Sequence, residues 1–108
     1  MASSKDYLQF VLEQLSDIEG ITYRPMMGEY IIYCKGKIIG GIYDNRFLVK
    51  PVKSALKYVK NIYFEVPYKG GKEMLLIDKI DDKEYLCGLI DAMLDELPQP
   101  KAKNFYKQ

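Results

Sequence analysis

Hydrophobic residues recur with helical spacing at the start of the chain. Ser3 and Ser4 can cap a helix, and apolar residues then follow at intervals of three to four positions. These positions are Tyr7, Phe10, Val11, Leu15 and Ile18. Gly20 is the kind of residue that commonly ends a helix. The pattern predicts an amphipathic helix that follows Ser4 and ends at Gly20.

Between residues 21 and 50 the pattern becomes that of strands. β-branched and aromatic residues dominate, and turn-forming residues interrupt them at positions 27–28, 35–37 and 44–46. This predicts an antiparallel meander of three or four strands. The segment from Tyr30 to Cys34 is apolar on both alternating faces, which predicts a central strand with one face against helices. Gly40-Gly41 lies inside the next strand and predicts a bulge, or close approach of another backbone or a bulky tyrosine.

The second half of the chain predicts two further helices that flank a hairpin. Pro51 can occupy the first turn of a short helix of about ten residues that ends at Asn61. Strands over 62–66 and 73–77 are joined through a loop rich in proline and glycine. A closing helix begins near Asp81-Asp82 and ends before Pro98.

This order of elements predicts an α+β fold. Written along the chain it is α-β(3-4)-α-β(2)-α, which implies a two-layer sandwich of a mainly antiparallel sheet with helices on one face. We expect one domain over residues 1–97 and a flexible tail over 98–108 that contains prolines and lysines.

Composition adds few functional constraints. The chain has 108 residues with a formal net charge of +1, so no global field attracts it to nucleic acid or anionic lipid. Its first residues lack the charge and apolar stretch of a secretion signal, which favours a cytoplasmic protein without a membrane segment. Cys34 and Cys87 are far apart in apolar surroundings and are expected to be buried, reduced thiols.

The chain contains no histidine, which limits the catalytic and metal-binding sites that it can form. A catalytic triad that uses histidine is excluded, and two distant cysteines cannot form a zinc site of the usual ligands. Acidic clusters near residues 81–84 and 91–96 are better explained by a helix N-terminus and a polar helix face than by a metal. We therefore expect no catalytic residue, cofactor or metal.

Lysines recur along the second predicted helix. Lys50, Lys53, Lys57 and Lys60 lie three to four residues apart and could form a basic ridge that contacts the phosphates of a nucleic acid. The chain has only two arginines, and a solvated helix face is the simpler interpretation of this ridge.

The segment from Arg24 to Tyr30 combines a cation, two methionines and a glycine. Arg24, Met26, Met27, Gly28 and Tyr30 could present an adaptable apolar surface beside a charge. Alternatively, the methionines fill the core and Gly28 adopts a positive φ in a turn, which the physics by itself favours. The ten tyrosines cannot all occupy one core face, so some are expected at the surface, where they suit protein interfaces.

The segment Arg24-Pro25-Met26-Met27-Gly28-Glu29-Tyr30 resembles the signature of the TfoX/Sxy N-terminal domain family. The likeness continues through Tyr33, Gly36-Lys37, the strand 47–50 and residues 97–101. The resemblance implies a two-layer fold similar to type III secretion chaperones. Two-domain members are implicated in natural competence together with the cyclic AMP receptor protein. For this chain the resemblance implies the stand-alone N-terminal domain, a regulatory or protein-binding module.

Three functional hypotheses follow. The first is a non-catalytic interaction module whose contact surface is the exposed sheet face or the Met26-Met27 turn, with a protein partner such as a transcription regulator, or a homodimer. The second is nucleic-acid binding through the lysine ridge and the basic tail. The third is a small-molecule binder or enzyme with a pocket near Arg24, Tyr30 and Gly40-Gly41.

Overall fold

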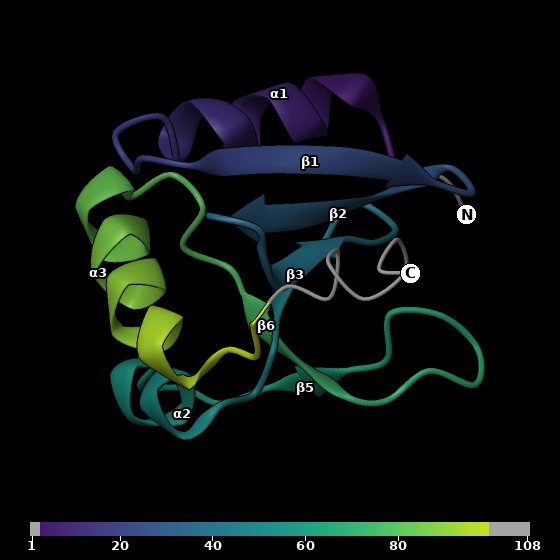
Figure 1. Cartoon of the computed structure of the whole chain (residues 1–108). Helices are drawn as coiled ribbons and strands as arrows, with labels where there is room; N and C mark the ends of the chain where they lie inside the picture. Colours follow the sequence, from purple (N-terminus) through teal and green to yellow (C-terminus); the bar gives the residue numbers. More distant parts are fainter. Residues whose placement is uncertain (1–2, 100–108) are drawn as a thin grey trace, which may run out of the picture.

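A computed structural model describes residues 3–99 as three α-helices, a short 3₁₀ helix and six strands (Figure 1). The part of the predicted tail from residue 100 onward lies outside the described residues. The elements in chain order are α1 (Lys5–Gln14), β1 (Ile21–Met26), β2 (Glu29–Cys34), β3 (Lys37–Ile42), β4 (Phe47–Val49), α2 (Lys53–Tyr58), β5 (Phe64–Glu65), β6 (Met74–Ile77), α3 (Lys83–Met93) and η1 (Leu94–Glu96).

The six strands form one antiparallel sheet in the order β1-β2-β3-β4-β6-β5. Both predicted strand groups are confirmed, and the first contains four strands. The second hairpin joins the first group because β6 pairs with β4. Strands β1 and β5 are therefore the two edges of the sheet.

Tight turns connect the first four strands. In each turn two successive residues have positive φ: Met27 and Gly28, then Lys35 and Gly36, then Asp44 and Asn45. Two central residues with positive φ are the mark of the type I′ turn, whose twist matches that of the strands it joins. The positive φ predicted at Gly28 is confirmed, at +86°.

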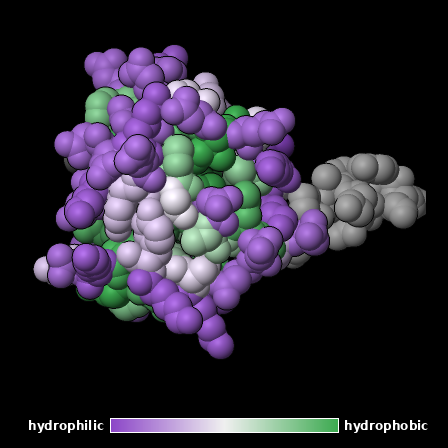
Figure 2. Space-filling model, turned by 90° about the vertical axis from the view of Figure 1, so that its left-hand side faces the viewer, coloured by the Kyte–Doolittle hydropathy of each residue, from purple (hydrophilic) through white to green (hydrophobic). Residues whose placement is uncertain are grey.

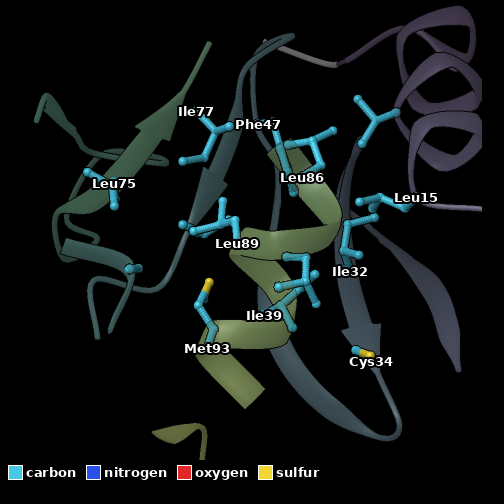
Figure 3. Close-up of a cluster of buried hydrophobic side chains, with 14 of the residues drawn as sticks. Leu15, Ile32, Cys34, Ile39, Phe47, Leu75, Ile77, Leu86, Leu89 and Met93 are labelled. Atoms are coloured by element: carbon cyan, nitrogen blue, oxygen red, sulfur yellow. The ribbon is translucent and has the colours of Figure 1, made fainter. Parts of the chain in front are cut away.

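All three helices pack on one face of the sheet, as predicted. The register places Ile32, Cys34 and Phe47 on that face, and they join a single buried cluster with residues of the helices. Figure 3 shows α3 lying over the strands with Leu86, Leu89 and Met93 directed into this cluster. Burying each such side chain contributes roughly 1.5–3 kcal/mol to folding. The protein is thus a two-layer α+β sandwich.

Gly40 and Gly41 lie beside a β-bulge, which confirms the prediction from the double glycine. The register between β2 and β3 shifts after Ile32, so that Ile39 is the extra residue. A Cβ added to Gly40 would lie 2.7 Å from the Val49 Cα atom. A Cβ on Gly41 would lie 2.7 Å from the ring of Tyr43. The glycines therefore allow both a neighbouring strand and a tyrosine ring to approach the backbone.

The helices differ from the predictions mainly at their ends. Ser4 caps α1 by accepting from the Tyr7 amide, but the helix ends at Gln14, six residues before Gly20. Phe10 is exposed instead of facing the core, and Leu8 takes the buried position. A bent segment connects α1 to β1, and its backbone lies close enough to accept from the Cys34 thiol at Glu19.

Helix α2 has six residues instead of about ten. Pro51 precedes the helix, and Val59 already has extended backbone angles, so Lys50, Pro51 and Lys60 lie outside it. Helix α3 begins as predicted, with Asp82 accepting from the Tyr85 amide. Both cysteines are free thiols; Cys34 is buried and Cys87 is only half-buried.

Candidate protein-interaction surface

The sheet face opposite the helices, here called the outer face, is strongly apolar. The strand register places Arg24 opposite Ile31, Ile31 opposite Gly41, Gly41 opposite Leu48 and Leu48 opposite Leu76. The larger apolar and aromatic residues on this face are Met26, Ile31, Tyr33, Ile38, Tyr43, Leu48, Tyr63, Met74 and Leu76. By contrast, the opposite side of the molecule, where α3 lies, is largely hydrophilic at its surface (Figure 2).

The loop between β5 and β6 covers part of the outer face. Arg46 donates to the Glu65 carboxylate at 2.7 Å and to the Val66 carbonyl at 3.2 Å, which ties this loop to the turn after β3. The rings of Tyr43 and Tyr68 lie 6.0 Å apart in an edge arrangement. Tyr43, whose ring the Tyr68 ring contacts, is buried, and Leu48 on the same face is buried too.

Burial changes the chemistry of Tyr43. Removal from water raises the pKa of its hydroxyl, and the neighbouring Tyr68, Glu29 and Tyr33 raise the pKa further. A tyrosine is neutral at physiological pH even without this shift, and Tyr43 serves as packing. Its ring lies between Tyr68 of the covering loop and Gly41 of β3.

The outer face over β1, β2 and β3 is more accessible. Arg24 and Ile38 are exposed, and Met26, Ile31 and Tyr33 are half-buried. Among residues 3–99 the ion pairs are Arg46 with Glu65 and Lys83 with Asp17, so Arg24 has no carboxylate partner within that range. An apolar surface bordered by a cation suits a protein interface.

Met27 is the most exposed large hydrophobic residue on this side. It occupies the first central position of the β1–β2 turn with φ +51° and is 95% exposed. A left-handed backbone costs a non-glycine residue about 1–2 kcal/mol, and Asn or Gly is the usual choice at this position. The expectation that Met27 could fill the core is wrong: it lies in solvent on a strained turn.

The turn that carries Met27 is held from both sides. The Ser3 amide donates to the Gly28 carbonyl at 3.0 Å, and the Ser3 hydroxyl donates to the Glu29 carboxylate at 2.5 Å. The same carboxylate accepts from the Asp44 amide at 3.1 Å. These bonds connect the chain before α1, the β1–β2 turn and the turn after β3. Met27 is consequently presented on a rigid support.

The residues predicted around Met27 separate onto two faces. Arg24 and Met26 lie on the outer face with Ile31. Tyr30 lies on the helix side, half-buried, with its ring 5.9 Å from that of Tyr23. The predicted surface is therefore Arg24, Met26, Met27 and Gly28 without Tyr30. The pocket suggested near Arg24, Tyr30 and Gly40-Gly41 does not form, because the first two residues point in opposite directions and Tyr43 fills the space over Gly41.

The predicted lysine ridge is shorter than expected. Only Lys53 and Lys57 belong to α2, whereas Lys50 lies directly after β4 and Lys60 follows the helix. The Glu96 carboxylate accepts from the backbone and the hydroxyl of Ser54, both at 2.8 Å. These bonds lower the pKa of Glu96, and Lys53 and Lys57 lower it further. An ionised carboxylate thus lies beside the two helical lysines and weakens the positive potential that a nucleic acid would encounter.

Ser3 and Glu29 were missed as supports of the turn. The local sequence indicates only a helix cap at Ser3, and the pairing of residues 26 apart in sequence gives no local signal. Within residues 3–99, no three side chains of the metal-binding types converge on one point, and no helix of that range is long and apolar enough to span a bilayer.

These features define a two-layer α+β protein whose sheet is covered by helices on one face and partly open on the other. No family model matches the chain, and no solved structure matches it. The chain is similar to an uncharacterized 12.7 kDa protein in the trpE 5′ region of Spirochaeta aurantia. The two sequences are 29% identical over 104 residues, which cover 95% of this chain and 90% of that protein.

Proposed function

We propose that this chain is a non-catalytic regulatory or protein-interaction module of the TfoX N-terminal type. The observation that carries the proposal is Met27, a fully exposed apolar side chain on a strained but rigidly held turn. A strained, exposed residue that lowers stability is retained most readily where it contributes to recognition. The partner is expected to be a protein, and a transcription regulator is the kind that the resemblance suggests.

The contact surface extends from Met27 over the open outer face. Met27 and Met26 provide flexible thioethers that adapt to an apolar partner, and Ile31, Tyr33 and Ile38 continue the apolar surface. Arg24 adds a cation at the border, where it would meet a carboxylate of the partner. The rigid support limits the conformational entropy lost on binding.

Affinity enrichment with matched variants tests this proposal. The immobilised protein is compared with Met27→Ser and Arg24→Ala, and with Phe10→Ser as a control that removes an exposed aromatic residue from α1. The expected result is one specific protein that the wild type and the control enrich equally and that both surface variants lose. Equal enrichment by all four proteins, or none by any, would contradict the proposed surface.

A parallel titration with labelled duplex DNA distinguishes the proposed protein-interaction module from a nucleic-acid-binding protein. Binding through lysines predicts an affinity that falls steeply as salt rises and that Lys53→Ala with Lys57→Ala weakens. Our proposal predicts no such binding at physiological salt. Salt-dependent binding that these lysine substitutions weaken, while Met27→Ser leaves it unchanged, would replace the interaction module with a nucleic-acid-binding protein.

A further inference from the structure

Among residues 3–99 no strand pairs with the outer edge of β5, and this edge is unusually apolar. Five of the exposed large hydrophobic residues lie within seven consecutive positions at this edge: Ile62, Tyr63, Phe64, Val66 and Tyr68. The segment is rich in β-branched and aromatic residues, and its one acidic residue, Glu65, is already paired with Arg46. Unprotected edges with this composition pair with further strands.

The other edge of the sheet has a protection that β5 lacks. The two-residue turn makes Met26 and Glu29 a hydrogen-bonded pair. Because pairs alternate, the next pair, Pro25 with Tyr30, is not hydrogen-bonded, and the backbone groups of Pro25 point away from β2 toward the edge of the sheet. Pro25 removes the donor at that outward position. Strand β5 contains no proline, so the outward N–H group of Phe64 is present.

The hydrogen bonds between β5 and β6 show which backbone N–H and C=O groups of β5 can pair with a further strand. The Leu76 amide donates to the Tyr63 carbonyl at 2.9 Å, which makes these two residues a hydrogen-bonded pair. Because pairs alternate in an antiparallel ladder, the next pair, Phe64 with Leu75, directs the Phe64 N–H and C=O toward the free edge.

We propose that β5 is a self-association edge that pairs antiparallel with β5 of a second copy of this chain, centred on Phe64. A two-fold axis at Phe64 lets the two Phe64 residues exchange both N–H···O bonds. The sheet then continues across both copies. The surface is separate from that of Met27, since β1 and β5 are opposite edges of the sheet.

The side chains are self-complementary in this register. Phe64 meets Phe64 of the second copy on the helix side. On the outer face Tyr63 meets Glu65, so the tyrosine hydroxyl can donate to a carboxylate that Arg46 already holds in place. No like charges face each other within residues 62–66. This absence of repulsion favours a second copy as the occupant.

Sedimentation equilibrium over micromolar to millimolar concentrations tests the proposal. An interface built on one short edge belongs to the class of small, weak interfaces, so the dimer is expected toward the upper part of this range. Phe64→Lys is expected to raise the dissociation constant more than about tenfold, because it removes the aromatic pair and places two like charges opposite each other. The control Phe10→Lys introduces the same charge on α1 and should leave the constant unchanged.

Amide hydrogen exchange of the wild-type protein provides a readout that needs no variant. The Phe64 amide should exchange quickly in dilute solution and at least about tenfold more slowly once the dimer forms, because its N–H gains a partner. A monomer at every concentration would overturn the proposal. So would a dimer that both lysine variants weaken equally, or one in which Phe64 exchanges as fast as in the monomer.

Discussion

At the scale of single residues, an exposed apolar side chain distinguishes Met27 from its equivalents in the other turns, which share its backbone conformation. Lys35 and Asp44 also have positive φ at the first central position of a type I′ turn, but Asp tolerates this conformation and Lys extends a charge into water. Met27 has neither the tolerance of Asp for this conformation nor the charge of Lys, and its apolar side chain is fully exposed. The strain at this residue therefore calls for a functional reason.

The substitution Met27→Asn should stabilise the protein. Asparagine adopts the left-handed conformation more readily and is the preferred residue before glycine in a type I′ turn, so the free energy of unfolding should rise by about 0.5–1 kcal/mol. Urea denaturation of the two proteins measures this difference. A loss of stability would show that the thioether makes a stabilising contact, and the argument for a recognition role would lose its basis.

The substitution Gly41→Ala should destabilise the protein by at least about 2 kcal/mol. Its Cβ would lie 2.5 Å from the Tyr30 carbonyl oxygen and 2.7 Å from the Tyr43 ring, and the carbonyl cannot move without breaking the ladder. Thermal denaturation provides the measurement. Gly70→Ala is the control, because its Cβ would meet no atom within 4 Å and its cost arises only from the positive φ of +86°. Equal losses for the two variants would mean that the sheet adjusts to the added methyl group.

At the scale of elements, contacts from distant segments define the short helices. Val52 provides no side-chain cap for α2, and the Glu96 carboxylate of η1 instead accepts from the second residue of the helix. Tyr58 at the end of α2 donates to the Tyr85 carbonyl of α3 at 2.9 Å. Helix α2 is therefore attached at both ends to the C-terminal helical segment.

The attachment at Tyr58 depends on Gly88 of α3. A Cβ on Gly88 would meet the Tyr58 hydroxyl and lie 3.1 Å from its Cζ atom. Alanine favours a helix over glycine by up to about 1 kcal/mol, yet Gly88→Ala should reduce stability by about 1 kcal/mol because the ring of Tyr58 must move.

In a Tyr58→Ala background the same change should increase stability, because only helix propensity then acts on residue 88. A double-mutant cycle by urea denaturation gives both values. If Gly88→Ala had the same sign in both backgrounds, the steric explanation would be wrong.

The attachment at Glu96 should depend on pH. Hydrogen bonds from Ser54 and the nearby lysines lower the pKa of Glu96 in the folded protein relative to the unfolded chain. The bound carboxylate therefore stabilises the fold above the pKa of the unfolded state, and this contribution is lost as pH falls through the lower folded pKa.

Comparison of the wild type with Glu96→Gln measures this dependence. The wild type should be more stable near neutral pH, and the difference should shrink toward zero at acidic pH where both side chains are neutral. Asp95→Gln, in the same short 3₁₀ helix, serves as the control and should show no comparable dependence. A difference that is constant with pH would show that the charge of Glu96 does not matter.

At the scale of the whole molecule, one core unites both halves of the chain. Residues from α1, α2, α3 and the strands belong to the same buried cluster, and β6 joins the two strand groups by pairing with β4. We expect a single cooperative unfolding transition. In calorimetry the measured enthalpy should equal the van't Hoff enthalpy, and a second transition would indicate that the β5–β6 region unfolds independently.

Local patterns in the sequence specify the fold class and most of the element order. Hydrophobic periodicity and turn residues are local properties, so the helix start at Ser4, the turn at Met27-Gly28 and the cap at Asp82 could be predicted from neighbouring residues. The bulge near Gly40-Gly41 was predictable for the same reason, because an interior glycine pair has no favourable local role in a strand.

Which surfaces are exposed depends on contacts between segments that lie far apart in the chain. The length of α2, the exposure of Phe10 and the separation of Arg24 from Tyr30 depend on sheet register and on contacts with distant segments. The support of Met27 by Ser3 arises because the chain before α1 lies against the β1–β2 turn, and the edge position of β5 arises from strand order. Such pairings join residues far apart in the chain, and because loop closure allows many of them at similar cost, local sequence cannot specify which one forms.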